Sequence, residues 1–156
     1  MQKIFEVKRE SFIISTDPAR LDLDVICDFL ARSYWADDRP RERIERSLAN
    51  SLVFGLYHDT KQIGLARVVT DFATFAWLCD VFINEPHRGR GLGKWLMESV
   101  ISHPDLQGLR RWLLATRDAQ GLYSQFGWTP LKNPERWMQK YNGKPIGLAG
   151  AVKVSE

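Results

Sequence analysis

The residues of this sequence whose types and spacing best suit chemistry form one short segment, Arg88–Lys94, which is Arg-Gly-Arg-Gly-Leu-Gly-Lys. Its three alternating glycines let the backbone approach a ligand closely and adopt positive φ angles. The segment lies between a predicted strand and a predicted helix, and the free N–H groups at the start of a helix attract phosphate oxygens. Two arginines and a lysine add positive charge. The segment therefore predicts a pyrophosphate-binding loop.

Two common nucleotide-binding loops fit this segment poorly. A P-loop requires a serine or threonine directly after its Gly-Lys pair, whereas Trp95 follows Lys94 here. A dinucleotide-binding fingerprint, Gly-x-Gly-x-x-Gly, follows the first strand of its fold. In this chain the third glycine, Gly93, comes one position early, and the segment lies in the middle of the chain. Both nucleotide interpretations are therefore disfavoured.

The apolar periodicity around this segment predicts an alternation of strands and helices. Four helices are expected: from Asp17–Pro18 to about Arg32, from Pro40 onward, from Leu92 to before Pro104, and Ala119–Phe126, closed by Gly127. Strands are expected at Phe12–Ser15, Ser51–His58, Gln62–Thr70, Phe75–Ile83 and Arg111–Ala115, with a final pair at Trp128–Leu131 and Trp137–Tyr141. The order β-α-α-β-β-β-α-β-α-β predicts an α/β (α+β) fold, a mixed sheet with helices on its faces.

Composition narrows the class of protein. The 156 residues, of which 44% are hydrophobic, suit a single domain over residues 1–156 with a substantial core. No apolar run approaches the ~18 residues that cross a bilayer. The first residues alternate charged with apolar types, so neither a membrane partner nor a secretory signal is expected. Two cysteines, Cys27 and Cys79, suit a reducing compartment, and we expect a cytoplasmic protein.

The net charge and the number of possible metal ligands narrow the class of protein further. The net charge of +3 is dispersed along the chain, whereas nucleic-acid binding favours a continuous basic face. The three histidines, His58, His87 and His103, are scattered, and with two cysteines they make no pattern of metal ligands. We therefore expect neither a nucleic-acid partner nor a metal.

Two motifs of the chain resemble those of the GCN5-related N-acetyltransferases, the GNAT superfamily. Arg88-Gly-Arg-Gly-Leu-Gly93 resembles the family's R/Q-x-x-G-x-G/A motif, and Leu122-Tyr123-Ser-Gln-Phe-Gly127-Trp128 is similar to its L-Y-x-x-x-G-F segment. The order of predicted elements is also similar, and the resemblance covers roughly Phe12 to Tyr141. It implies a mixed, mostly antiparallel sheet with helices on both faces, acetyl-CoA as the donor, and a small-molecule or peptide amine as the acceptor.

The resemblance also implies where acetyl-CoA binds. The family's pyrophosphate contacts fall on Gly89, Arg90, Gly91, Leu92, Gly93 and Lys94, and Arg88 opens the motif. The pantetheine arm pairs in this family with the end of a strand, which corresponds here to Val81, Phe82 and Ile83. A sheet edge offers N–H and C=O groups that can complement the pantetheine amides. These residues also suit a plain core strand, and both interpretations can hold together.

Acetyl transfer requires that the amine lose a proton and that the departing thiolate gain one. Tyr123 matches the family tyrosine that often protonates this thiolate, although an aromatic ring there could simply pack on the cofactor tail. Asp80 lies within an apolar run, where burial would raise its pKa, and it could accept the amine proton. Its alternative role is to cap backbone groups in the sheet.

One departure from the family pattern affects the acid–base assignment. Many members carry an asparagine about seven residues before the tyrosine, and Thr116 stands at that spacing here. Asp118 follows two residues later. It could cap the short helix, or its carboxylate could lie near the cofactor thiol.

Acceptors of this family enter over the first helices and the strand hairpin. The residues of this chain that could line that entrance are Tyr34, Trp35, Asp71 and Trp77. Aromatic faces with nearby carboxylates suit an amine with an apolar or cationic body. Asp71 also suits a turn, and both tryptophans also suit a core.

The leading hypothesis is an N-acetyltransferase that works by direct attack, with a general base and a tyrosine acid. The alternative is a sensory or interaction module that binds acetyl-CoA without turnover. A sheet edge near the C-terminus could pair two copies into a homodimer.

Overall fold

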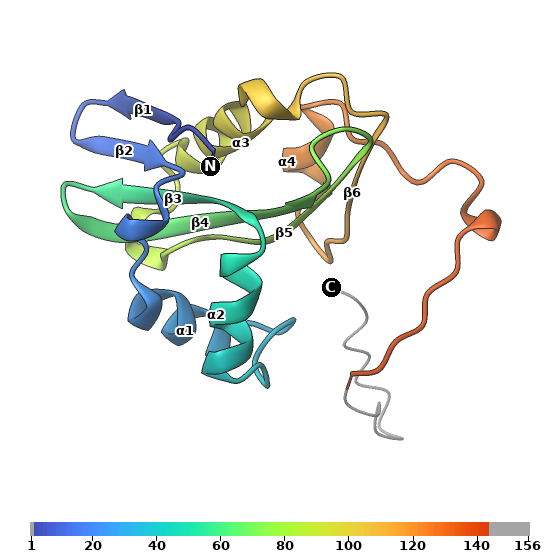
Figure 1. Cartoon of the computed structure of the whole chain (residues 1–156), viewed down its shortest axis with the longest axis horizontal. Helices are drawn as coiled ribbons and strands as arrows, with labels where there is room; N and C mark the ends of the chain where they lie inside the picture. Colours follow the sequence, from blue (N-terminus) through green and yellow to red (C-terminus); the bar gives the residue numbers. More distant parts are fainter. Residues whose placement is uncertain (1, 144–156) are drawn as a thin grey trace.

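The computed structural model describes residues 2–143, and its centre is one six-stranded sheet (Figure 1). The strands cross the sheet in chain order: β1 (Glu6–Arg9), β2 (Phe12–Ser15), β3 (Leu52–His58), β4 (Lys61–Thr70), β5 (Phe75–Ile83) and β6 (Arg111–Leu114). Neighbouring strands are antiparallel, except that β5 and β6 are parallel. The predicted mixed, mostly antiparallel sheet is confirmed.

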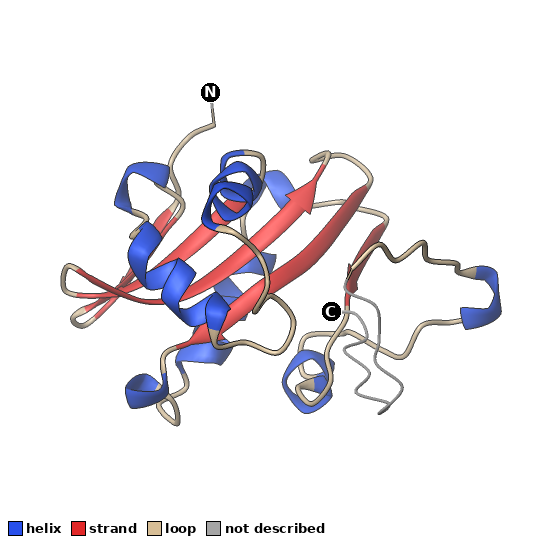
Figure 2. Ribbon diagram, turned by 90° about the horizontal axis from the view of Figure 1, so that it is seen from below, coloured by secondary structure: helices blue, strands red, loops and turns tan. Residues whose placement is uncertain are grey.

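Helices cover both faces of the sheet, as Figures 1 and 2 show. The helices α1 (Leu23–Ala31) and α2 (Arg41–Ala49) pack on one face, and α3 (Leu92–Ile101) and α4 (Gln120–Ser124) pack on the other. Asp22 caps α1, because its carboxylate accepts a hydrogen bond from the N–H of Val25 at 3.2 Å. Pro40 directly precedes α2, as its predicted role at a helix start requires.

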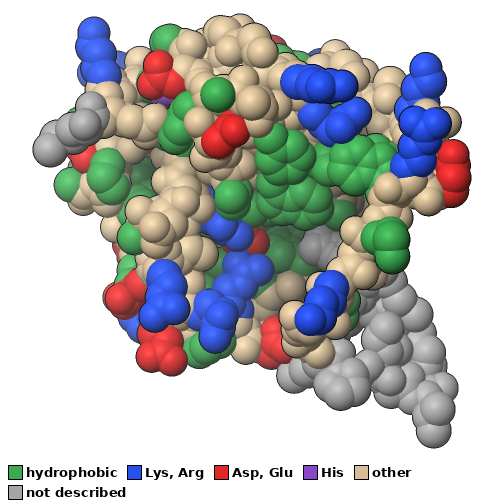
Figure 3. Space-filling model, turned by 45° about the vertical axis from the view of Figure 1, so that its right-hand side comes forward, with side chains coloured by type: hydrophobic (Ala, Val, Ile, Leu, Met, Phe, Trp, Pro, Cys, Tyr) green, Lys and Arg blue, Asp and Glu red, His purple; other side chains and the backbone are tan. Residues whose placement is uncertain are grey.

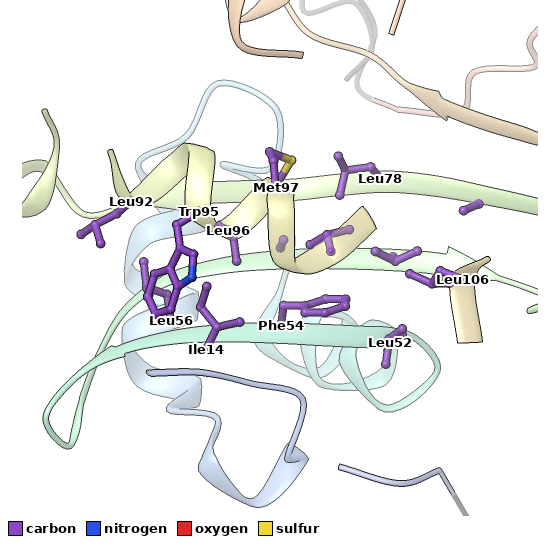
Figure 4. Packing of buried hydrophobic residues seen from close by; sticks show 14 of the residues in the cluster. Ile14, Leu52, Phe54, Leu56, Leu78, Leu92, Trp95, Leu96, Met97 and Leu106 are labelled. Carbon is purple, nitrogen blue, oxygen red and sulfur yellow. The ribbon is translucent and has the colours of Figure 1, made fainter. Parts of the chain in front are cut away.

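The larger hydrophobic core lies between α3 and the sheet (Figure 4). Leu92, Trp95, Leu96 and Val100 recur at helical spacing along α3 and are all buried. They pack in one cluster with residues of β2 and β3, among them the fully buried Phe54. A buried side chain of this size contributes about 1.5–3 kcal/mol to folding. This packing fixes where the first turn of α3 lies.

A backbone irregularity in β5 opens the sheet. Asp80 has a φ of 51°, in the left-handed region. At this point the pairing with β4 shifts, because Leu65 pairs with Phe82 whereas Arg67 pairs with Cys79. On its other side, β5 pairs with β6 only over Phe75–Leu78. The edge of β5 beyond Leu78 therefore has no strand beside it in the described part of the chain.

The predicted final strand pair, Trp128–Leu131 and Trp137–Tyr141, is wrong. Residues 125–143 form no strand; they run as an irregular segment with a short 3-10 helix at Pro134–Arg136, which extends away from the sheet in Figure 1. Pro130 falls inside the first predicted strand, and a proline supplies no N–H to a ladder. The strand edge proposed for a homodimer is accordingly absent from residues 125–143.

The ends of other elements also differ from expectation. The predicted first helix is interrupted: a 3-10 turn at Pro18–Arg20 ends in extended backbone at Leu21, and α1 begins anew after its own cap. The first strand, β1, was not predicted, because its sequence Glu-Val-Lys-Arg is mostly charged and lies at the sheet edge. The last helix, α4, is shorter than predicted, but Gly127 has the positive φ of 95° that suits a C-cap glycine.

Candidate acyl-transfer site

A cleft of about 660 Å³ lies where β5 and β6 separate. Its walls come from the end of β5, the start of α3, the loop after α1 and the segment that leads into α4. Most of the predicted site residues line it: Tyr34, Trp35, Val81, Phe82, Ile83, Arg88, Gly89, Gly91, Leu92, Gly93, Asp118 and Tyr123. Segments far apart in the chain are thus brought to one place by the opened sheet.

The glycine loop leaves its backbone N–H groups available. Gly89 and Gly91 have φ angles of 77° and 76°, which residues with side chains rarely adopt. Gly91 is the N-cap of α3, and no side chain caps it. The N–H groups of residues 89–94 donate no hydrogen bond to any described residue. They form an uncapped helix start with partial positive charge, which suits an anion.

The loop also leaves room for a ligand. A Cβ atom built on Gly89, Gly91 or Gly93 would meet nothing within 4 Å. Arg88 fixes the loop to the strand, because its Nε donates to the carbonyl oxygen of Ile83 at 2.9 Å. A diphosphate could therefore approach the loop backbone without displacing any described side chain.

The end of β5 offers both a packed side and an open edge. The Phe82 ring stacks on Phe29 of α1, with centroids 3.9 Å apart, so this side chain belongs to the smaller core under α1 and α2. Val81 and Ile83 pack toward the α3 side. The backbone between them borders the cleft and has no strand beside it among the described residues. The two predicted roles of this segment, core packing and a ligand-pairing edge, are compatible here.

Tyr123 is held inside the cleft by α4. The residue is 8% exposed, and its ring packs edge-on against Trp128 at 5.8 Å between centroids. No hydrogen bond between its hydroxyl and a described residue contributes to its titration. Burial raises the pKa of Tyr123 to about 12, with a smaller contribution from Tyr34. The phenol is therefore protonated at neutral pH and can donate a proton.

The loop after α1 meets the segment before α4 across the cleft. The guanidinium carbon of Arg117 lies 3.8 Å from the ring centroid of Tyr34, and the Arg117 backbone N–H donates to the Tyr34 hydroxyl at 3.3 Å. Tyr34 in turn packs edge-on against Trp35. These contacts join two walls of the cleft, the loop after α1 and the segment that leads into α4.

The proposed cap role of Asp118 is wrong. Ala119 occupies the N-cap position of α4, and its N–H donates to the Thr116 hydroxyl at 3.1 Å. In the sequence Asp118 lies between Thr116 and Ala119. Its carboxylate is exposed and lies 3.8 Å from the guanidinium group of Arg117. It lines the cleft, so a place beside the cofactor stays a prediction.

Asp80 is the most constrained acid of the site region. Its side chain is 2% exposed. Oδ2 accepts hydrogen bonds from Arg39 Nη1 and Arg67 Nε, and Oδ1 accepts one from Trp35 Nε1, each at 2.8 Å. The predicted rise of its pKa is wrong. Burial alone would raise the pKa of Asp80, but the two guanidinium groups outweigh burial and lower it.

These contacts predict that Asp80→Asn is strongly destabilising. The amide keeps the left-handed backbone, which asparagine tolerates, but removes the charge that two partly buried guanidinium groups require. Breaking a buried ion pair costs about 3–5 kcal/mol, which urea unfolding would measure. Because the pKa of the folded carboxyl is lowered from 3.8, its stabilisation is present above about pH 4 and is lost as pH falls through the folded pKa.

Asp59→Asn is the matched control. Asp59 has a similar φ of 55°, but its carboxylate is 76% exposed at the β3–β4 turn. Its replacement should cost under about 0.5 kcal/mol. Equal losses in the two variants would contradict a structural role for the Asp80 ion pairs.

Five predicted residues lie outside the cleft lining: Asp71, Trp77, Asp80, Arg90 and Lys94. The Asp71 carboxylate caps its own turn, because it accepts from the N–H groups of Ala73, Thr74 and Phe75 and from the Thr74 hydroxyl. Trp77 lies in the middle of the sheet, paired with Val69 and Leu113. Acceptor binding by these two side chains stays a prediction that no contact supports.

Several lining residues were not predicted as site residues from the sequence. They are Phe29, Arg32, Ser33, Glu85, His87, Arg117, Ala119 and Leu122. Arg32 and Glu85 form an ion pair at 3.0 Å that joins the end of α1 to the segment before the glycine loop. Arg32 lies one turn from Phe29 on α1, a spacing that could have indicated a shared face. Nothing in the sequence indicates its pairing with Glu85.

No three or more His, Cys, Asp or Glu side chains within residues 2–143 are grouped as metal ligands. Among the same residues, no helix is long and apolar enough to span a membrane.

Comparison with known proteins shows the family and the fold. The sequence model of the Acetyltransferase (GNAT) family matches residues 21–128. The protein FG08082 of Gibberella zeae, whose name describes an acetyltransferase, is 34% identical, over 75% of this chain and 78% of its own. The crystal structure of the GNAT-family protein Xcc2953 from Xanthomonas campestris pv. campestris has a TM-score of 0.81 and 44% identity, over 90% of this chain and 94% of that one.

A more distant structure shows the same fold. It is a GNAT family acetyltransferase from Elizabethkingia anophelis with acetyl-CoA bound, with a TM-score of 0.61 and 16% identity over 80% of each chain.

Proposed function

Since this chain belongs to the acetyltransferase (GNAT) family, we propose that it transfers the acetyl group of acetyl-CoA to the nitrogen of an amine. The observation that carries the proposal is the uncapped start of α3, where the N–H groups of residues 89–94 have no partner among the described residues and the three glycines leave open space beside a cleft. A coenzyme diphosphate has the charge and the acceptor oxygens that these groups lack.

The cleft also suits the rest of the coenzyme. With the diphosphate at the glycine loop, the pantetheine arm extends along the free edge of β5, where its amides pair with the backbone of Val81–Ile83. The thioester then lies near Tyr123, between α4 and the Tyr34–Trp35 loop, all of which line the same cleft.

The chemistry needs only one activated bond, which the thioester of acetyl-CoA supplies. As the neutral amine nitrogen forms its bond to the acetyl carbon, the carbon–sulfur bond breaks. The proton that the nitrogen loses passes to solvent water, from which the Tyr123 phenolate later regains one. Tyr123 gives its phenol proton to the sulfur, and its high pKa keeps it in the acid form until then. Tyr34 and Trp35 position the acceptor with their ring faces and edges.

The assignment of Asp80 as the general base has weaker support than the assignment of Tyr123 as the acid. Its two oxygens already accept three charge-assisted or indole hydrogen bonds, and a carboxylate with a lowered pKa is a weak proton acceptor. These contacts favour a positioning role, in which Asp80 holds Trp35 at the cleft wall. The same observation favours the second candidate function, an acetyl-CoA-binding module without turnover.

Release of free CoA distinguishes the two functions. We expect the protein to bind acetyl-CoA with micromolar affinity in calorimetry, and to release thiol from it only when an amine of a suitable class is present. Thiol is detected with a chromogenic disulfide, and the acetylated amine by mass spectrometry. Binding without release over a broad amine panel would support the sensory module. Absence of acetyl-CoA binding would refute both functions.

A further inference from the structure

The ion-paired cluster at Asp80 carries more positive than negative charge. It joins Arg39, at the end of the loop after α1, to Arg67 on β4, and both guanidinium groups contact the same carboxylate oxygen. The two arginine side chains are 22% and 13% exposed. Two positive charges thus share one negative charge at a largely buried place. A partly buried excess charge is costly unless a further partner compensates it.

Both arginines keep donors for such a partner. Arg39 donates from Nη1, and Arg67 donates from Nε to Asp80 and from Nη1 to the Ser51 hydroxyl at 3.1 Å. The Nη2 groups of both side chains, and Nε of Arg39, have no hydrogen bond to a described residue. A guanidinium group offers five N–H donors in a planar arrangement that suits carboxylates and phosphates.

The cluster adjoins the acceptor end of the cleft. Trp35 contacts both the cluster and the cleft, because its indole N–H donates to Asp80 and its residue lines the cleft. Asp80 is followed directly in β5 by Val81, which borders the coenzyme path. In Figure 3 this side of the molecule is hollowed, with hydrophobic side chains on the upper wall and basic side chains beside an acidic one inside the hollow.

We propose that the acceptor amine carries an anionic group, a carboxylate or a phosphate, which the free donors of Arg39 and Arg67 bind. This inference rests on the proposed acetyl transfer and adds the chemical class of the acceptor. Asp80 holds the two guanidinium groups in place and leaves their outer donors for the ligand. The amine then extends past Trp35 toward the thioester. The sequence predicts instead an acceptor with an apolar or cationic body, but Asp71, the carboxylate expected at its entrance, caps its own turn outside the cleft lining.

Matched pairs of amines test this class directly. Phenylalanine is compared with phenethylamine, and phosphoethanolamine with ethanolamine, so that each pair differs only in the anionic group. We expect kcat/KM of the wild-type protein to be about 10-fold or more higher for the anionic member of at least one pair, since charge-assisted hydrogen bonds of this kind are worth that factor. The pair that responds identifies carboxylate or phosphate.

Arg39→Gln supplies the second readout, with Arg43→Gln as the control. Both changes remove one positive charge near α2, but Arg43 is exposed on the helix and has no contact with Asp80. Arg39→Gln should raise KM for the anionic amine about 10-fold and narrow the preference within the pair. Arg43→Gln should leave both values within about 2-fold. Circular dichroism and acetyl-CoA affinity verify that each variant is folded.

Every outcome bears on the inference. Equal rates within both pairs, or a preference for the neutral members, would overturn it while leaving acetyl transfer intact. If no amine is turned over, binding of each pair to the CoA-loaded protein is measured by calorimetry. Tighter binding of the anionic member that weakens in Arg39→Gln would then support the anion site, although the proposed transfer had failed. Equal binding, or none, would overturn both.

Discussion

Gly91→Glu is expected to weaken acetyl-CoA binding by at least about 100-fold. Gly91 has a φ of 76° at the N-cap of α3, so a side chain there costs about 1–2 kcal/mol of backbone strain. The added carboxylate would occupy the open space at the loop. It would accept hydrogen bonds from the same N–H groups that we assign to the diphosphate. Its negative charge would also repel the diphosphate. Isothermal titration calorimetry measures the change.

Gly108→Glu separates the site effect from backbone strain. Gly108 has a φ of 77°, and a Cβ there would also meet nothing within 4 Å. It lies outside the cleft lining, in the turn before β6. This variant should lose similar stability but keep acetyl-CoA affinity within about 2-fold. Equal affinity losses in both glycine variants would refute the assignment of the loop.

Tyr123→Phe is expected to lower kcat by about 10²–10⁴-fold, the usual contribution of a positioned general acid. Acetyl-CoA affinity should stay within about 2-fold. The reason is that no hydrogen bond with a described residue contributes to the pKa of Tyr123, so removal of its hydroxyl leaves no buried partner unpaired. Steady-state kinetics measures the loss of kcat, and calorimetry measures whether acetyl-CoA affinity is retained.

A control and a pH profile sharpen the test of Tyr123. Tyr141→Phe removes a phenol that is 52% exposed and outside the cleft lining, and it should leave kcat unchanged. Because the pKa of Tyr123 is raised to about 12, the wild-type kcat should show no loss from phenol ionisation below about pH 10. An unchanged kcat in Tyr123→Phe would remove the acid role from this residue.

The local signals of this chain predicted most of its fold. β5 occurs at the predicted residues, Phe75–Ile83, and α3 begins at the predicted Leu92. Both have strong apolar periodicity and clear ends, so local preference and burial agree. The segment after α4 does not form its predicted strands, although it carries apolar residues such as Trp128 and Trp137. Pro130 interrupts the row of backbone N–H donors that a strand ladder needs.

The glycine loop could be predicted because one contiguous segment carries its backbone chemistry. The Asp80 cluster could not. Its partners Trp35, Arg39 and Arg67 lie 13 to 45 residues away in the chain, and the sequence shows neither the bulge nor the bond directions that unite them. For the same reason the direction of the Asp80 pKa was predicted wrongly: burial was visible in the apolar run, but the compensating charges were not.

The central claim, that residues 89–94 hold the coenzyme diphosphate, is tested most directly by a crystal structure of the protein with CoA bound. We expect diphosphate oxygens within hydrogen-bond distance of the N–H groups at the start of α3, with the pantetheine amides beside Val81–Ile83. A coenzyme bound elsewhere, with these N–H groups still facing solvent, would contradict the account.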